Sequence, residues 1–244
     1  GILQGLGPDA RERVIWRFSL QGGDEQSHDR TTLNKGSWKR IQASIASLYE
    51  VGGCRLTGNM CVVTSNYEAV EKLAHLAHRY EFENLHLDMI RPRDSGDRTE
   101  QYLRSIMSRY SDMAPAFRAL VRSSDELLGP DYDVNIGNLP YCIAPDIAHK
   151  IHHEGQFTVT VAASGQGTTQ AGFDKYLDKR TDKHKMESCS DCVFDGSCGG
   201  IFDLYEKFYG HDEFSPVSAD QLAEIDQAGH HFVLLNRPSI ERWE

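Results

Sequence analysis

Cysteine residues in the second half of the chain have a spacing that suits metal chemistry. The segment CSDCVFDGSCGG begins at Cys189 and contains a CxxC pair, Cys189 and Cys192, followed six positions later by Cys198. A CxxC turn lets two sulfurs converge on one metal atom or on two corners of a cluster. The glycines of the segment allow the backbone to wrap closely and to direct N–H groups toward sulfur. The pattern predicts a metal or cluster site, with a redox CxxC or buried thiols as the alternative.

Three thiolates normally need a fourth ligand. Cys142 is the best candidate, because it lies in the same half of the chain, beside Pro140, after an expected strand. His184 is an alternative fourth ligand. Cys61 falls in an apolar strand, where a small core residue is expected, and Cys54 is expected to be a surface or loop thiol. Four cysteine ligands suit either a structural zinc ion or an iron–sulfur cluster, and spacing alone does not separate the two.

The composition excludes several classes of protein. The chain has 244 residues, enough for one large domain or two smaller ones, and its hydrophobic content of 39% and charged content of 25% are ordinary for a globular protein. A net charge of −10 argues against a general nucleic-acid binder. No stretch reaches the roughly 18 uninterrupted apolar residues of a membrane span. Residues 1–7 lack the charge and the apolar run of a signal peptide, so the cytoplasm is the expected location and a disulfide framework is not expected.

The first half of the chain alternates strands and helices. Strands are expected over residues 14–21, 55–64 and 85–90. Between them the apolar spacing predicts a helix over residues 37–49, with Ser37 as its N-cap, and a second helix opening at Asn66. A long helix is expected over residues 99–128, kinked at Pro115. Repeated strand–helix alternation predicts βαβ units and a parallel sheet.

The pattern changes after Gly129. Expected strands cover residues 134–136 and 157–163, and expected helices cover residues 145–153, 199–209 and 218–227, the last with Ser218 as N-cap. Residues 164–172 read as a polar loop. The predicted division is residues 1–128 for the strand–helix part, residues 129–216 for the cysteine-containing domain, and residues 217–244 for a C-terminal helix and tail.

The segment CSDCVFDGSCGGIFDLYEKFYGHDEFSPV resembles the auxiliary-cluster region of radical S-adenosylmethionine proteins of the SPASM/twitch type. The upstream segment LPYCIAP looks like the element that supplies a further cluster ligand in such proteins. RFSLQGGDEQSHDR, NMCVVTSN and LHLDMIRPR resemble the fourth, fifth and sixth barrel strands of the same superfamily. The resemblance covers roughly residues 11–216.

The resemblance implies a fold class of α/β type: the C-terminal half of a partial (β/α)6 TIM-like barrel, followed by a small α+β auxiliary-cluster domain. It implies a [4Fe–4S] cluster on Cys142, Cys189, Cys192 and Cys198. The CxxxCxxC that binds the catalytic cluster does not occur in these residues. We therefore expect the chain to be the C-terminal part of an oxidoreductase that, when complete, holds a second [4Fe–4S] cluster and S-adenosylmethionine. Such an enzyme modifies a peptide or small molecule and receives electrons from a donor such as flavodoxin or ferredoxin.

Polar residues at the ends of the expected strands are candidates for binding S-adenosylmethionine. Ser19 and Gln21 alternate along one strand, Asn59 lies on the next, and Arg91 follows the third and could bind a carboxylate. Each could instead be an ordinary polar group at a strand end. Asp88 lies in an apolar strand and therefore needs a partner.

Further residues invite weaker interpretations. His28 and Asp29 are expected to cap a turn or helix, and the pairs His152-His153 and His230-His231 are expected to be surface residues. The aromatic residues Phe202, Tyr205, Phe208 and Tyr209 are expected to pack over the cluster. Two other functions remain open: a zinc-stabilised interaction module, and a non-catalytic electron-transfer protein.

Overall fold

The computed structural model describes residues 5, 7–92, 98–152, 159–160, 173–174, 181–226 and 229. The chain divides into two compact units. The first comprises residues 1–90 and 97–137, and the second comprises residues 91–96 and 138–244.

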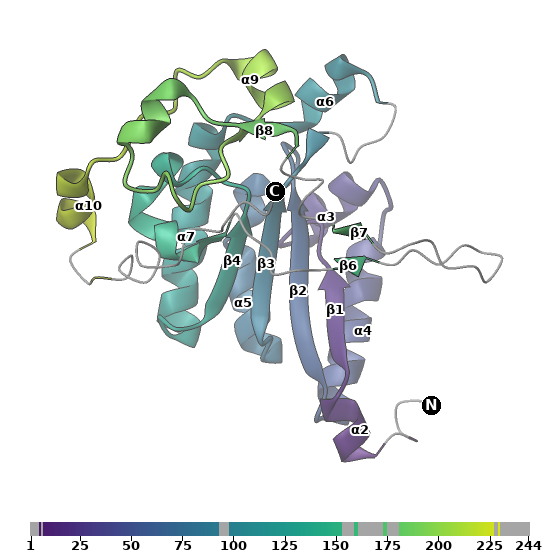
Figure 1. Ribbon diagram of the computed structural model, residues 1–244. Helices are drawn as coiled ribbons and strands as arrows, with labels where there is room; N and C mark the ends of the chain where they lie inside the picture. The colour runs from purple at the N-terminus through teal and green to yellow at the C-terminus, as the bar shows by residue number, and fades with distance from the viewer. Residues whose placement is uncertain are drawn as a thin grey trace. The chain divides into compact units, whose positions relative to one another are not determined.

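The first unit is built on a parallel sheet. Its strands are β1 (Ile15–Ser19), β2 (Arg55–Val62), β3 (Asn84–Met89) and β4 (Asp133–Gly137), and each pairs in parallel with the next along the chain (Figure 1). The mixed α/β class and the parallel sheet predicted from strand–helix alternation are therefore confirmed.

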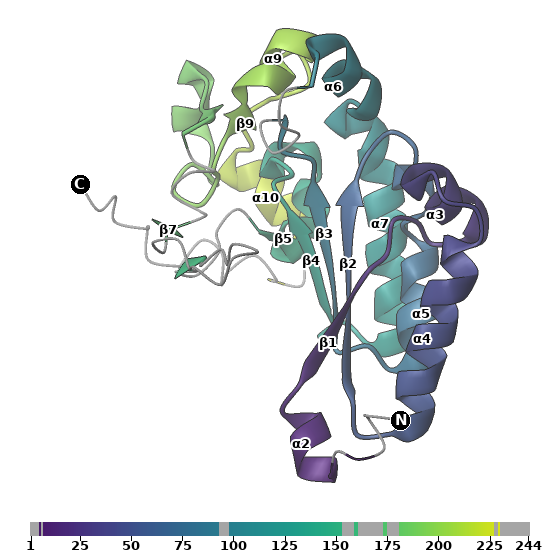
Figure 2. The same ribbon diagram turned by 90° about the vertical axis from the view of Figure 1, so that its right-hand side faces the viewer.

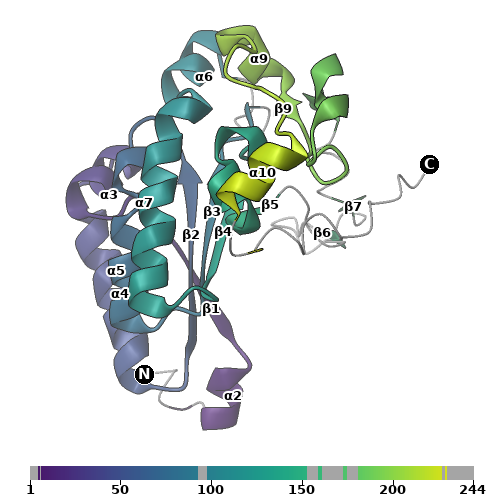
Figure 3. The same cartoon turned by 90° about the vertical axis from the view of Figure 1, so that its left-hand side faces the viewer.

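Helices cover one face of this sheet. In chain order the helices of the unit are α2 (Pro8–Glu12), α3 (Glu25–Thr32), α4 (Ser37–Val51), the 3-10 turn η1 (Tyr67–Ala69), α5 (Lys72–Tyr80), α6 (Glu100–Ile106) and α7 (Tyr110–Leu128). Figures 2 and 3 show α3, α4, α5 and α7 on the same side of the strands. The strands turn alternate apolar residues toward them; Met60, Leu87 and Ile136 are at most 1% exposed. Each such side chain contributes about 1.5–3 kcal/mol through burial.

The other face of the sheet is polar. In register across the four strands lie Ser19, Asn59, His86 and Asn135, one from each strand. Because successive side chains on a strand point to opposite faces, these residues share the face away from the buried leucines and methionines. The alternation on β3 is complete, since its odd-numbered residues are buried and its even-numbered residues are half-buried.

The beginning of α4 differs from the prediction. Ser37 is its first helical residue, and Gly36 occupies the N-cap position without a side-chain bond. The capping acceptor comes from another helix: Asp29 accepts hydrogen bonds from the backbone N–H of Gly36 and of Trp38 and from the Ser37 hydroxyl. The expectation that Asp29 caps a turn or helix is confirmed. The Trp38 N–H, followed by the other donors, lowers the pKa of the Asp29 carboxyl.

The long helix predicted over residues 99–128 is two helices, α6 and α7. The break lies at residues 107–109, and Pro115 is inside α7. The main chain at the break is held from outside the helix, because the Ile106 carbonyl accepts from the Thr64 N–H at 2.9 Å and the Ser108 hydroxyl donates to the Thr64 hydroxyl at 3.0 Å. One continuous helix over residues 99–128 was therefore the wrong prediction.

The second unit consists of short elements. They are η3 (Tyr141–Ile143), η4 (Pro145–Lys150), β5 (Ile151–His152), β6 (Val159–Thr160), β7 (Phe173–Asp174), β8 (Lys183–His184), η5 (Glu187–Asp191), β9 (Ile201–Phe202), α9 (Asp203–Tyr209) and α10 (Ala219–Ile225). β6 pairs with β7, and β8 with β9, both antiparallel.

Several predictions for this unit need correction. The helix predicted over 145–153 is a 3-10 turn followed by β5, and the helix predicted over 199–209 begins only at Asp203, after β9. Of the strand predicted over 157–163, the structure describes β6; the loop 164–172 lies outside the described residues. The last helix is confirmed, with Ser218 and Gln221 forming a capping box.

Among the described residues, none of the helices combines the length and the apolar character that crossing a membrane requires.

Candidate metal centre

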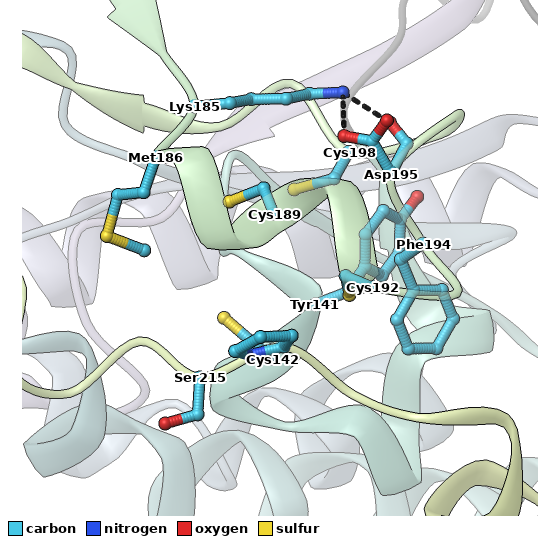
Figure 4. Close-up of a pocket in the computed structure, with 11 residues that line it drawn as sticks. Tyr141, Cys142, Lys185, Met186, Cys189, Cys192, Phe194, Asp195, Cys198 and Ser215 are labelled. Atoms are coloured by element: carbon cyan, nitrogen blue, oxygen red, sulfur yellow. Dashed lines mark hydrogen bonds and ion pairs between the residues drawn. The ribbon is translucent and has the colours of Figure 1, made fainter.

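Four cysteines line a single pocket in the second unit (Figure 4). Cys142 comes from η3, two residues after Pro140, and Cys189 from η5. Cys192 follows η5, and Cys198 lies in the turn before β9. The structure thus brings together the four sequence-predicted ligands, which are separated by up to 56 positions along the chain. The pocket is partly open to solvent.

Tight turns hold the three clustered cysteines in place. The N–H of Cys192 donates to the carbonyl of Cys189 at 3.0 Å, which closes the CxxC turn. The N–H of Cys198 donates to the carbonyl of Phe194 at 2.8 Å, which closes a second turn. The Val193 N–H donates to the Val217 carbonyl at 2.9 Å and ties this segment to the chain after α9.

Backbone N–H groups act on three of the four cysteines. Cys198 Sγ accepts from the Gly200 N–H at 3.4 Å, and Cys192 Sγ accepts from the Val217 N–H at 3.4 Å. The backbone N–H of Ser215 acts on Cys142 by lowering the pKa of its thiol, against the effect of burial. A hydrogen bond donated to sulfur favours the thiolate over the thiol, and hydrogen bonds to sulfur are a recurring feature of iron–sulfur sites.

Gly200 is required at its position for two reasons. Its φ of +82° is in the left-handed region, and a Cβ atom there would lie 2.1 Å from the carbonyl oxygen of His184. Only glycine therefore lets β9 pass this close to β8 while its N–H reaches Cys198.

Two stacked aromatic rings form one wall of the pocket. The ring centroids of Tyr141 and Phe194 are 4.9 Å apart, with an angle of 21° between the planes, and both side chains are buried. The aromatic residues expected over the cluster lie elsewhere: Tyr205 packs against Tyr209 and Phe214 in a separate small core. Tyr141 and Phe194 were not singled out from sequence, although each is within two residues of a cysteine.

The electrostatics of the pocket oppose four free thiolates. Burial, followed by the charge of Cys198, raises the pKa of Cys142 to about 12, although the Ser215 N–H acts in the opposite direction. Burial also raises the pKa of Cys198, against the N–H groups of Gly200 and Tyr141 and the cations Lys185 and Lys183. Four thiolates at this place therefore need a positively charged centre, which is what a metal supplies.

Lys185 is held beside the pocket by an ion pair. Its Nζ donates to Asp195 Oδ1 at 2.8 Å and to the Asp195 carbonyl. Figure 4 shows this pair across one edge of the pocket. The positive charge of Lys185 is therefore held where it acts on the sulfur of Cys198.

As the side chains lie, no three His, Cys, Asp or Glu groups of the described residues surround a point closely enough to hold a single metal ion. His184, the alternative fourth ligand, is not among the residues that line the pocket, and its Nε2 lies 3.0 Å from Glu206 Oε2. Cys54 and Cys61 are half-buried in the first unit.

The residues predicted to bind S-adenosylmethionine divide between the units. Ser19 and Asn59 are register partners, and the Ser19 hydroxyl lies 3.3 Å from Asn59 Oδ1. Gln21 lies beyond the end of β1, not on it; its N–H donates to His28 Nδ1 at 3.0 Å. Arg91 belongs to the second unit, where its Nε donates to Asp182 Oδ2 at 2.8 Å.

His28 has a role that the sequence did not indicate. It is buried, accepts the Gln21 N–H and packs against the ring of Trp38 with centroids 5.4 Å apart. Burial lowers the pKa of His28, against the opposing charge of Asp29, which favours the neutral ring that accepts this bond. His28 was expected to cap a turn or a helix, and its ring does accept a backbone N–H from the loop before α3; its packing against Trp38 was not predicted.

Asp88 has the partner that its position required. Its Oδ2 lies 2.9 Å from His86 Nε2, and both side chains are about one-third exposed on the polar face of the sheet. His86 was missed, although two ionisable residues at i and i+2 on one strand were a visible signal. Of the histidine pairs, His152 is on β5, and His153, His230 and His231 lie outside the described residues.

Comparison of the chain with family models, with curated proteins and with solved structures finds no match.

Proposed function

We propose that the second unit holds a [4Fe–4S] cluster on Cys142, Cys189, Cys192 and Cys198. The observation that carries the proposal is that all four cysteines line one pocket and no cysteine of the first unit does. The N–H donors to sulfur and the two lysines near Cys198 support a bound, negatively charged iron–sulfur–thiolate centre.

The positions of the cysteine side chains support a cluster over a zinc ion. In a structural zinc site the four sulfurs lie about 2.3 Å from one point, which leaves no space between them. The four cysteines line one pocket, but among the described residues no three His, Cys, Asp or Glu groups are placed to hold a single metal ion. A cluster distributes its four ligands over four iron atoms, so its cysteines surround a larger body.

The first unit supports a role in a radical S-adenosylmethionine enzyme. Parallel sheets covered on both faces usually carry apolar residues on both, whereas this sheet has one apolar and one polar face. Ser19 and Asn59 on the polar face would hydrogen-bond the ribose or methionine part, as the resemblance of the strands implies. A flavodoxin or ferredoxin would supply electrons.

In such an enzyme the catalytic cluster supplies electrons that cleave S-adenosylmethionine to a 5′-deoxyadenosyl radical, and the substrate is a peptide or small metabolite. The residues of the second unit would hold the auxiliary cluster, exclude water with the Tyr141–Phe194 stack, and orient the thiolates through backbone N–H groups. With four cysteine ligands, the cluster would serve as an electron relay or as a structural centre.

Metal analysis of anaerobically prepared protein tests the proposal. After reconstitution with iron and sulfide, we expect a brown protein with stoichiometric iron and sulfide. The variant Cys142→Ser should lose this loading, and the matched control Cys54→Ser, outside the pocket, should retain it. A colourless protein that binds one zinc ion through the same cysteines would support the zinc-stabilised module instead.

A further inference from the structure

Cys189 differs from the other three cysteines in how its sulfur is held. Backbone N–H groups donate hydrogen bonds to the sulfurs of Cys192 and Cys198, and the Ser215 N–H favours the thiolate of Cys142; among the hydrogen bonds of the described residues, none reaches the sulfur of Cys189. Its own backbone is fixed, since its N–H donates to the Met186 carbonyl at 3.0 Å. The difference therefore concerns the sulfur alone.

Cys189 also lies in the most exposed surroundings. It is the central residue of η5 (Glu187–Asp191), a turn with no buried residue, and its four neighbours in that turn are all exposed. By contrast, Cys142 lies between buried Tyr141 and Ile143. Figure 4 shows Cys189 on the η5 turn, at the same pocket as Met186.

Both differences weaken a metal–thiolate bond. A hydrogen bond donated by an N–H group stabilises the negative charge of a thiolate. A sulfur without such a bond therefore carries a less stabilised charge when it binds iron. Exposure gives water and small molecules access to the bond. The fold therefore stabilises three of the four thiolate ligands more than it stabilises Cys189.

We infer that Cys189 is the exchangeable ligand of the centre: it is the thiolate that releases its iron first. This inference rests on the proposed function and specifies which corner of the cluster opens. An opened corner would face a pocket that reaches solvent, where a small thiol or carboxylate can take the place of Cys189.

The opening has a defined chemical balance under mild oxidation. Ferricyanide accepts one electron from a [4Fe–4S]2+ core and becomes ferrocyanide. Loss of Fe2+ then leaves a [3Fe–4S]+ core and frees one cysteine thiolate. Iodoacetamide alkylates that thiolate with release of iodide, which marks the residue permanently.

Peptide mapping of the wild-type protein tests the inference without any substitution. The reconstituted chain is treated anaerobically with ferricyanide, an iron chelator and iodoacetamide, and the alkylated fraction of each cysteine is measured over time. We expect Cys189 to be labelled several-fold faster than Cys142, Cys192 and Cys198. Cys54, which needs no oxidation to react, gives the internal reference.

A pair of variants provides the second measurement. Cys189→Ala should keep several-fold more iron and sulfide than Cys192→Ala, its partner in the same CxxC turn, and added 2-mercaptoethanol should shift the visible spectrum of Cys189→Ala only. Circular dichroism checks that both variants fold. Equal labelling of the four cysteines, or prior labelling of one of the other three, overturns the inference. Failure of the wild-type chain to take up iron and sulfide overturns the proposed function itself.

Discussion

Replacing Gly200 by alanine should disrupt the candidate metal centre through the backbone alone. The residue has φ +82°, a conformation that costs an L-residue about 1–2 kcal/mol. The new Cβ would lie 2.1 Å from the His184 carbonyl oxygen and 2.7 Å from its carbon, so backbone must move. Forcing extra atoms into a packed site typically costs about 1–3 kcal/mol, which gives a total of about 2–5 kcal/mol.

The matched control is Gly196→Ala in the same segment. A Cβ at Gly196 meets nothing within 4 Å, and its backbone is not in the left-handed region. We therefore expect this variant to behave like the wild type. Both substitutions add one methyl group, but only the methyl group at position 200 would overlap the His184 carbonyl.

Two assays measure the effect. Urea unfolding should show the midpoint of Gly200→Ala lowered by about 1–2.5 M, given a dependence of about 2 kcal/mol per M. Iron and sulfide loading should fall with it, because movement of Gly200 withdraws the N–H that donates to Cys198. If Gly200→Ala unfolds at the same urea concentration as Gly196→Ala and binds as much iron, the reasoning about this backbone position is refuted.

Two further predictions concern ion pairs. Burial alone would raise the pKa of Asp24, but the Lys72 ammonium and backbone N–H donation lower it to about 2. The stabilising contribution of Asp24 is therefore complete above about pH 4 and is lost as pH falls through 2. Asp24→Asn should cost about 1 kcal/mol at pH 7, after allowance for solvent exposure, and almost nothing near pH 1; a difference independent of pH would contradict this. The side chains of Asp182 and Arg91 are 1% and 13% exposed at their ion pair. Asp182→Asn should therefore lower the free energy of unfolding by about 3 kcal/mol, whereas Arg55→Ala, at an exposed ion pair, should lower it by at most about 1 kcal/mol. Similar losses for the two variants would show that burial does not matter here.

Local patterns of the sequence predicted most of the first unit. The apolar alternation in residues 55–64 and 85–90 identified β2 and β3 within two residues, because a strand with one buried face must repeat with period two. The break between α6 and α7 escaped prediction because its cause is a hydrogen bond to Thr64, more than forty residues away. Ser37 was predicted to cap α4, but Asp29 provides the capping acceptor. Asp29 belongs to a different helix, and the sequence shows only which residues are neighbours along the chain.

The candidate metal centre shows the same limit. The spacing of the CxxC pair and Cys198 predicted three ligands, and the position of Cys142 near Pro140, after an expected strand, predicted the fourth. The N–H donors from Ser215 and Val217 could not be predicted, because any residue other than proline could supply them. The resulting difference between Cys189 and its neighbours exists only in the folded chain.

X-ray absorption at the iron and zinc edges of the anaerobically prepared chain tests the central claim most directly. A [4Fe–4S] centre on the four cysteines predicts an iron edge with a sulfur first shell and an iron–iron shell beyond it. A zinc edge with a first shell of sulfur and no iron signal would contradict it.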